Sequence, residues 1–428
     1  MVTFVIVAAF LCSLCACGST GKNVENVEKE SAESDVTTKT STPMPESELA
    51  ENGAATSFSE VGEKYSLQMP VYAESQWYLK YDDAKFSDEL SFDNFTLDDA
   101  GRLISYDQIV KDRKSYGITN EYDEQGNVKK SFWESAKGSL NNKTYEYENE
   151  YDENGRLIKV TRIEKEDGED DKIIYFTYDE NGLLTSKSGK GGSFLYEYQY
   201  EYNESGMVQK ESSIRDGLLR QDEEYQYDDV GRVSKSIETD YDKEGNISSV
   251  YETDIEYDPY GHALFGDVKE TFDIQGDKSH AIRKFSYVVA GYKTLNSEDD
   301  ATLNPASKWV SFNENKELPT PDSVVPALCT QAGESTNGVY EFILDAGEKD
   351  PLGYDYFDRG YSDVLANTIQ KTPNEAFWKY TGVLSQLLGF EVNELDEGRF
   401  IISKDGFPVA EILYGAKEGN YCLTVTLK

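Results

Sequence analysis

A seven-residue segment that occurs in eight variant copies constrains the fold of this chain more than any other feature. Residues 151–157 read Tyr-Asp-Glu-Asn-Gly-Arg-Leu, and close variants begin at Leu97, Tyr122, Tyr178, Tyr202, Tyr227, Tyr241 and Tyr257. The motif glycines stand at positions 101, 126, 155, 182, 206, 231, 245 and 261. Most successive glycines lie about 25 residues apart, which leaves room for two strands of roughly 6 to 10 residues and two turns. Each repeat therefore predicts one β-hairpin.

The recurring chemistry within each copy is that of a turn. An Asp or Asn side chain can accept a hydrogen bond from the backbone two residues further on, and the glycine supplies a positive φ. The same Asp could suggest a calcium loop. Calcium loops, however, place three or more oxygen donors at alternating positions and end in a bidentate Glu. We therefore interpret the motif as a turn, and we predict no metal and no cofactor.

Tyrosines alternate with charged or polar residues in the strands between these turns. Residues 196–202 read Tyr-Glu-Tyr-Gln-Tyr-Glu-Tyr, and residues 145–147 read Tyr-Glu-Tyr. Because successive side chains of a strand point to opposite faces, one face of the sheet is rich in tyrosine. Such a face can contact a sugar or a protein, or it can be the core of the sheet itself. The candidate ligand-contact residues are Tyr145, Tyr147, Tyr196, Tyr198, Tyr200 and Tyr202.

The pattern Tyr-Asp-x-x-Gly-Arg-Leu is similar to the YD repeat of the RHS and teneurin families, from Leu97 to Gly261. This resemblance implies successive hairpins that can coil into a shell, used on cell surfaces for carbohydrate or protein contact, or to enclose a toxin. The copies here are few, and the last two steps, from Gly231 to Gly245 and from Gly245 to Gly261, are shorter than the others. We therefore expect a mainly β protein in which an antiparallel meander forms a curved, open sheet.

Residues 1–17 have the character of a targeting segment. An apolar run over residues 2–16 ends in Leu-Cys-Ala-Cys at residues 14–17, which resembles the lipobox of bacterial lipoproteins. The resemblance implies a signal peptide over residues 1–17, diacylation of Cys17, and a lipid anchor on the extracytoplasmic face of the cell membrane. The run is too short for a membrane-spanning helix, which needs about 20 residues. Residues 18–57 have almost no large apolar side chain and predict a disordered tether.

Three further segments complete the predicted organisation. Residues 58–295 hold the repeats and form the β-sheet domain. Residues 296–337 are rich in Asn, Pro, Ser and Thr, which favours an extended linker. Residues 338–428 form a small domain that resembles no functional family we recognise.

The last domain combines strands with one helix. Val339 to Leu344 reads as a strand, and Thr-Pro-Asn-Glu at residues 372–375 is a helix start. Apolar residues then recur at helical spacing until Gly389 ends the helix. Three more strands follow, with a bend near residues 405–406. A helix packed on an antiparallel sheet is an α+β arrangement.

Two cysteines, Cys329 and Cys422, lie outside the leader and in or beside this last domain. An extracytoplasmic compartment permits disulfides, so the pair could be bridged. Cys422 also lies in an apolar strand, which is equally consistent with buried free thiols. Both alternatives remain open at this point.

The charge and the missing motifs exclude several functions. A formal net charge of -39 disfavours nucleic acid and anionic lipid as partners. Neither His262 nor His280 has a partner at metal-ligand spacing, and no nucleophile, zinc or phosphate-binding motif is present. We therefore expect no enzyme.

The sequence as a whole predicts a non-catalytic lipoprotein that binds or scaffolds through its tyrosine-rich sheet, with a glycan or a cell-surface protein as ligand. One alternative is a structural or immunity module for co-exported RHS-type proteins. A second is a glycan-acting enzyme that uses a pair of carboxylates.

Overall fold

The structure is a computed structural model that describes residues 58–81, 87–137, 142–163, 172–191, 194–228, 231–257, 263–272, 278–312, 317–332, 337–344, 374–396, 398–417 and 420–428. The predicted signal peptide, the predicted lipidation residue Cys17 and the predicted tether lie outside the described residues. The last copy of the motif, at 257–261, is described only at Tyr257.

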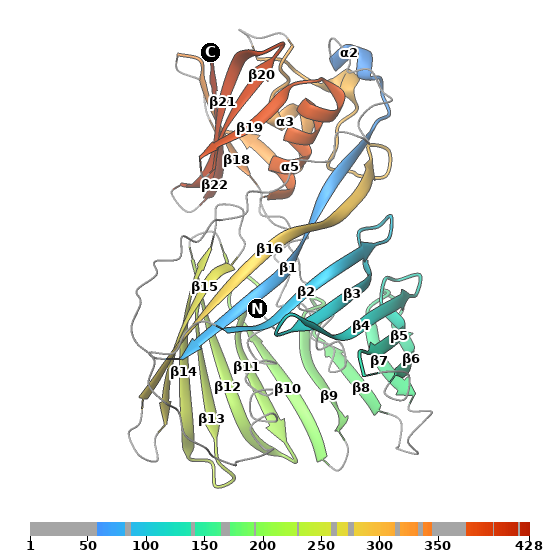
Figure 1. The fold of residues 1–428 in the computed structure, drawn as a ribbon, viewed down its shortest axis with the longest axis vertical. Helices are drawn as coiled ribbons and strands as arrows, with labels where there is room; N and C mark the ends of the chain where they lie inside the picture. Colours follow the sequence, from blue (N-terminus) through green and yellow to red (C-terminus); the bar gives the residue numbers. More distant parts are fainter. Residues whose placement is uncertain are drawn as a thin grey trace.

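Sixteen strands in the described residues form one closed antiparallel barrel, in which each strand pairs with the next along the chain (Figure 1). They are β1 (Ser66–Tyr81), β2 (Ser87–Leu97), β3 (Leu103–Val110), β4 (Arg113–Tyr122), β5 (Val128–Ser135), β6 (Lys143–Tyr151), β7 (Leu157–Ile163), β8 (Lys172–Tyr178), β9 (Leu184–Gly191), β10 (Phe194–Tyr202), β11 (Val208–Arg215), β12 (Leu218–Tyr227), β13 (Val233–Tyr241), β14 (Ile247–Tyr257), β15 (Ala263–Phe272) and β16 (Lys278–Asn296). The prediction of a mainly β protein built from successive hairpins is confirmed.

The prediction of an open sheet is wrong, because β1 pairs with β16 and closes the barrel. Their antiparallel register runs from Ser66 opposite Asn296 to Tyr81 opposite Ala281. This pairing joins the two edges of the sheet, so the backbone N–H and C=O groups that an open edge would expose are paired. Neither strand carries the repeated motif, and the two strands are far apart in the sequence. No local pattern therefore reports the closure.

The motif turns lie mostly at one end of the barrel. The turns at 98–102, 123–127, 152–156, 179–183, 203–207 and 228–232 each join an even-numbered strand to the odd-numbered strand that follows. The copy at 241–246 instead joins β13 to β14, which places it at the opposite end. The two short steps between motif glycines lie on either side of this additional turn. They do not mark the end of the repeat array.

The C-terminal part of the chain forms a second unit, an α+β module as predicted. Its six-stranded sheet has the order β17-β18-β22-β21-β20-β19. The strands are β17 (Cys329–Gln331), β18 (Val339–Leu344), β19 (Glu391–Asp396), β20 (Arg399–Lys404), β21 (Phe407–Lys417) and β22 (Asn420–Leu427). The helix α5 (Asn374–Gly382) continues as one π-helical turn, η3 (Val383–Leu387), and Gly389 follows with a φ of 70°. No helix in the described ranges is long and apolar enough to cross a membrane.

The prediction of an extended linker over 296–337 is wrong, because the described part of this segment is folded into the module. It holds the short helices η2 (Ala306–Lys308) and α3 (Pro321–Val324), and Pro321 occupies the first helical position after Thr320. Apolar side chains from the segment are buried in the same core as the sheet and α5; they are Leu303, Ala306, Trp309, Phe312, Leu318, Val324, Val325 and Leu328. Pro321 therefore starts a helix, and Pro319 forms a β-bridge with Ser311, so neither extends a linker. The helix α2 (Phe58–Val61) also packs against this core.

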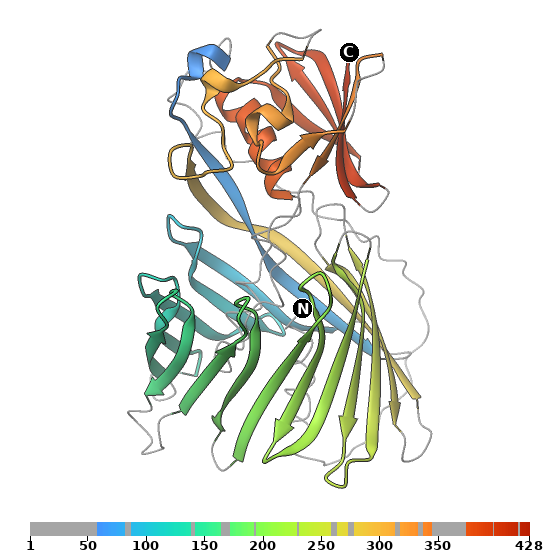
Figure 2. The same cartoon turned by 180° about the vertical axis from the view of Figure 1, so that it is seen from behind.

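The module lies at the end of the barrel that carries most motif turns (Figures 1 and 2). The backbone N–H of Gln68 in β1 donates to Oε1 of Gln386, and Nε2 of Gln386 donates to the carbonyl oxygen of Gln68, both over 2.8 Å. The rings of Tyr72 and Trp378 are 5.9 Å apart. Strand β1 therefore links the barrel to η3 through hydrogen bonds and to α5 through ring packing.

The structure also rejects the disulfide alternative. Cys329 stands opposite Leu344 in β18, and Cys422 stands opposite Ile343 of the same strand. Strand β18 thus separates the two cysteines, so their Cα atoms are about 10 Å apart, beyond the limit of roughly 7 Å for a bridge. Both are free and buried.

Candidate functional site

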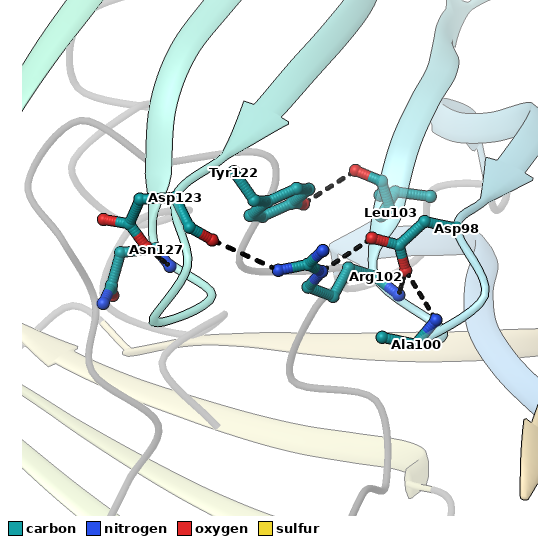
Figure 3. A network of polar contacts seen from close by, with 7 residues as sticks. All are labelled: Asp98, Ala100, Arg102, Leu103, Tyr122, Asp123 and Asn127. Atoms are coloured by element: carbon teal, nitrogen blue, oxygen red, sulfur yellow. Dashed lines mark hydrogen bonds and ion pairs between the residues drawn. The ribbon is translucent and has the colours of Figure 1, made fainter.

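Each motif turn is built around its Asp or Asn side chain. Oδ1 of Asp98 accepts the backbone N–H groups of Ala100 over 3.0 Å and of Arg102 over 2.8 Å, and Oδ2 accepts Nε of Arg102 over 2.6 Å (Figure 3). An equivalent bond to the residue four positions on recurs at Asp123, Asp152, Asp179, Asn203, Asp228 and Asp242. Within the described ranges, no group of three or more potential ligands could hold a metal. The turn chemistry that the motif predicts is confirmed.

The tyrosine that precedes the turn has its own structural partner. The hydroxyl of Tyr122 donates to the carbonyl oxygen of Leu103 over 2.7 Å (Figure 3). Leu103 begins the neighbouring strand, directly after the preceding turn. The same link joins Tyr178 to Leu157, Tyr202 to Leu184, Tyr227 to Val208 and Tyr257 to Val233. The motif tyrosine therefore ties one hairpin to the next at the end of the barrel.

The motif arginine connects successive turns in a second way. The guanidinium of Arg102 lies 5.0 Å from the centre of the Tyr122 ring, and Nη1 of Arg102 donates to the carbonyl oxygen of Asp123 over 3.5 Å. Arg156 lies in the same way on Tyr178, at 4.9 Å. A guanidinium over an aromatic ring at such distances is attracted by the ring quadrupole. We define the YD rim as the end of the barrel formed by the turns 98–102, 123–127, 152–156, 179–183, 203–207 and 228–232.

In two copies of the motif the tyrosine hydroxyl donates to a carboxylate in place of a backbone carbonyl. The hydroxyl of Tyr151 donates to Oδ2 of Asp123 over 2.5 Å, and Nδ2 of Asn149 donates to the same oxygen over 2.8 Å. Tyr241, whose turn lies at the opposite end, donates to Oδ2 of Asp222 over 3.2 Å. In both copies a carboxylate replaces the backbone carbonyl as the acceptor.

All six candidate tyrosines lie on the inner wall of the barrel. Tyr200 and Tyr202 pack against the buried cluster of Val208, Tyr225, Val233 and Ile255, and Tyr147 packs against a second cluster around Leu157. Since buried clusters occupy the enclosed face of a closed barrel, the tyrosines face inward and the alternating Glu197, Gln199 and Glu201 face outward.

Three of the inward tyrosines have specific neighbours. Tyr145 lies under the guanidinium of Arg162 at 4.6 Å, and Tyr198 lies under Nζ of Lys187 at 4.8 Å. Tyr196 is buried across Gly189, where a side chain would collide with its hydroxyl. The tyrosine rows are therefore partly structural, since they pack on their own wall.

Sequence reasoning missed an aromatic and polar group on β4, β5 and β6, which we call the aromatic station. The ring of Trp133 is 5.9 Å from Tyr116 and 5.9 Å from Tyr145, in edge-to-face contacts. Asn120 and Ser131 stand opposite each other beside these rings, and both are buried. Nδ2 of Asn120 has no hydrogen-bond partner in the described part of the chain. Only the strand register brings these residues together.

A second sector of the inner wall, on β11 to β15, is acidic. Glu211, Glu223 and Glu238 stand directly opposite one another on three successive strands. Burial raises the pKa of Glu238 to about 8, and the neighbouring carboxylates of Glu223 and Asp240 act in the same direction. Burial also raises the pKa of Glu223, whose Oε2 accepts the hydroxyl of Tyr225 over 2.8 Å. Like charges that face one another favour the protonated form.

Comparison with known proteins supports the repeat assignment. The Teneurin YD-shell family model matches residues 75–196. No curated protein matches the chain. Among solved structures, a porin-like protein from Bacteroides uniformis is similar, with 13% identity and a TM-score of 0.25, over 50% of this chain and 96% of that chain. The Tc holotoxin pore of Photorhabdus luminescens is similar with 12% identity and a TM-score of 0.23, over 78% of this chain and 14% of that chain. The family match over residues 75–196 and the turn geometry are both consistent with repeats of the YD type.

Proposed function

We propose that this protein is a lipid-anchored, extracytoplasmic binding protein that holds a glycan inside its barrel. The observation that supports this most is the position of the tyrosine face on the inner wall of a closed barrel. A ligand-contact face at this position would enclose its ligand and would not present it on an open surface.

The width of the barrel favours an enclosed ligand. Barrels of about 8 strands are filled by their own side chains, whereas barrels of about 16 strands leave an aqueous interior. This barrel has sixteen strands. Its inner wall carries aromatic, amide and charged side chains, which suit a watery interior and a polar ligand.

The aromatic station offers the contacts that a sugar ring requires. An aromatic face contacts the apolar face of a sugar, while amides and hydroxyls bind its hydroxyl groups. Trp133 and Tyr145 supply the rings, and Asn120 supplies an amide whose nitrogen is buried and has no partner among the described residues. A sugar hydroxyl would satisfy that amide.

The outward wall and the leader favour a location in water beside a membrane. Glu197, Gln199 and Glu201 face outward on β10, and rows of carboxylates are costly against lipid. The lipobox-like segment before Cys17 would supply the anchor. The barrel would then stand outside the cytoplasmic membrane on its tether.

A glycan array with residues 58–428 tests the binding, followed by titration of any glycan that binds. We expect Trp133→Ala and Tyr145→Ala to weaken binding about 10-fold or more each, because each removes an aromatic contact. Tyr175→Ala, on an outward-facing and exposed ring, is the matched control. Absence of any glycan ligand, or equal weakening by the control, would overturn the proposal.

The anchor is tested separately in the full chain. Wild-type protein should incorporate palmitate and remain in the membrane fraction, and Cys17→Ala should do neither. If Cys17→Ala keeps both properties, the anchor assignment is wrong.

A further inference from the structure

We infer that the YD rim is a docking surface for aromatic side chains of a protein partner, with Arg102 and Arg156 as its two contact points. This inference does not rest on a ligand inside the barrel. It rests on a third arginine of the same rim, Arg232, which already contacts an aromatic ring of the C-terminal module.

Arg232 shows how the rim binds a ring. Its guanidinium lies 4.6 Å from the centre of the Tyr257 ring in the barrel, and 5.4 Å from the ring of Tyr421. Tyr421 is in β22, in the sheet of the C-terminal module. One guanidinium thus contacts an aromatic ring of its own barrel and a second ring from the module that lies at this end.

Arg102 and Arg156 make the same contacts within the barrel as Arg232 does. Nε of each arginine donates to Oδ2 of the Asp four residues earlier, over 2.6 Å in Arg102 and 2.7 Å in Arg156, as it does over 2.7 Å in Arg232. Each also lies on the tyrosine of the next motif turn, Tyr122 or Tyr178. The ion pair and the ring fix each guanidinium before any partner arrives, so little side-chain entropy is lost on binding.

What differs is the second ring. Arg102 and Arg156 each contact one aromatic ring in the described residues, whereas Arg232 contacts two. Their side chains are 37% and 33% exposed, compared with 25% for Arg232. The exposed part of each guanidinium can therefore accept a ring from outside, as Arg232 accepts Tyr421.

The chemistry of the rim specifies the partner. The charge of each guanidinium is already balanced by an Asp, so an aromatic ring fits better than a further carboxylate. Tyrosine suits such a partly exposed position, because its ring packs while its hydroxyl remains in water. The turns of Arg102 and Arg156 are four strands apart, which is about 19 Å along the rim. A protein that presents two tyrosines at this separation would engage both arginines and gain from their linkage.

Arginine side-chain NMR of the folded protein, residues 58–428, tests the inference. The Nε–H resonances are assigned with Arg102→Lys and Arg156→Lys and then followed during titration with N-acetyl-tyrosinamide at millimolar concentration. We expect ring-current shifts at Arg102 and Arg156 and none at Arg232. N-acetyl-leucinamide, which has no ring, should shift none of the three.

The variant Tyr421→Leu supplies the second arm. It keeps a large apolar side chain in the module core but removes the ring from Arg232, so the probe should now shift all three resonances. Three results would overturn the inference: no response at Arg102 and Arg156, the same response to the leucine probe, or an Arg232 resonance that stays fixed in Tyr421→Leu. Glycan binding has no part in this readout. A failure of the proposed glycan binding would therefore leave the result for the rim unchanged.

Discussion

The hydroxyl of Tyr178 donates a hydrogen bond to the carbonyl oxygen of Leu157 over 2.9 Å, and this bond joins two neighbouring hairpins of the barrel. The Asp and Gly of the motif are accounted for by the backbone of their own turn. The tyrosine is accounted for by the neighbouring strand, and the arginine by the next tyrosine. Each part of the repeated motif thus has a structural role in the barrel wall.

Removal of this hydroxyl should lower stability at the rim. Tyr178→Phe leaves the carbonyl of Leu157 without its donor, and we expect a loss of about 1 kcal/mol in the free energy of unfolding, measured by urea denaturation. Tyr175→Phe is the matched control, because its ring is 50% exposed on the outward face of the same strand. Equal losses in the two variants would show that the hydroxyl bond contributes nothing specific.

Substitution of Asp123 should lower the free energy of unfolding more than substitution of an exposed residue in the same turn. Its carboxylate accepts the backbone N–H of Asn127, the hydroxyl of Tyr151 and the amide of Asn149. Asp123→Ala removes the acceptor for all three donors, and we expect it to cost about 2 to 3 kcal/mol in urea denaturation. Glu124→Ala changes the adjacent exposed position of the same turn and should be nearly neutral. Comparable losses in the two variants would contradict this role of Asp123.

Calcium should have almost no effect on the repeats. The Asp oxygens of the turns are occupied by backbone N–H groups and by arginine, and no cluster in the described ranges offers three metal ligands. A thermal melt with millimolar calcium should therefore superimpose on one with a chelator. A large upward shift of the melting temperature would mean that the turns bind the ion.

The sequence predicts the local elements of this fold well, because each depends on neighbours along the chain. The turn at 152–156 and the strand Val339–Leu344 are both where the pattern places them. Closure of the barrel depends on the pairing of Ser66 with Asn296, which no period or motif reports. Trp309 and Phe312 lie close together in an otherwise polar segment, beside the exposed Val310, so their burial could not be recognised before the sheet was known.

The candidate site shows the same limit. Alternation along β10 predicts a tyrosine face, but it does not say whether that face is inside or outside a closed wall. Asn120 and Trp133 have no distinguishing sequence pattern, and only the register of three strands brings them beside Tyr145. Contacts between strands therefore decide the site, and single-strand patterns do not.

The two cysteines give a direct chemical test of the module. Residues 58–428 contain Cys329 and Cys422 as their only cysteines. Because both are buried and free, Ellman's reagent should react with neither in the folded protein and with both after denaturation without reductant. Absence of reactive thiol in the denatured, non-reduced protein would mean that the two are bridged.

The acidic sector of the inner wall makes the stability of the barrel depend on pH. Glu238 stands between Glu223 on β12 and Tyr251 on β14, with Asp240 on its own strand, and the guanidinium of Arg283 acts on it from β16. Burial and the two neighbouring carboxylates outweigh the hydrogen bond from Gln221 and the charge of Arg283, and they raise the pKa of Glu238 from 4.5 to about 8. The folded state therefore keeps this proton at pH values where the unfolded chain has released it.

The sign of the effect follows from this difference. A carboxyl whose pKa is higher in the folded state contributes stability that is fully present below pH 4.5 and is lost as the pH rises through about 8. We expect the free energy of unfolding to fall between pH 5 and 8 by an amount on the order of a few kcal/mol from this group. Glu238→Gln cannot ionise, so its urea denaturation should show a flatter pH dependence and greater stability at pH 8. Glu224→Gln, on the outward and exposed side of β12, should keep the wild-type slope. An unchanged slope in Glu238→Gln would mean that Glu238 is not the group that couples folding to pH.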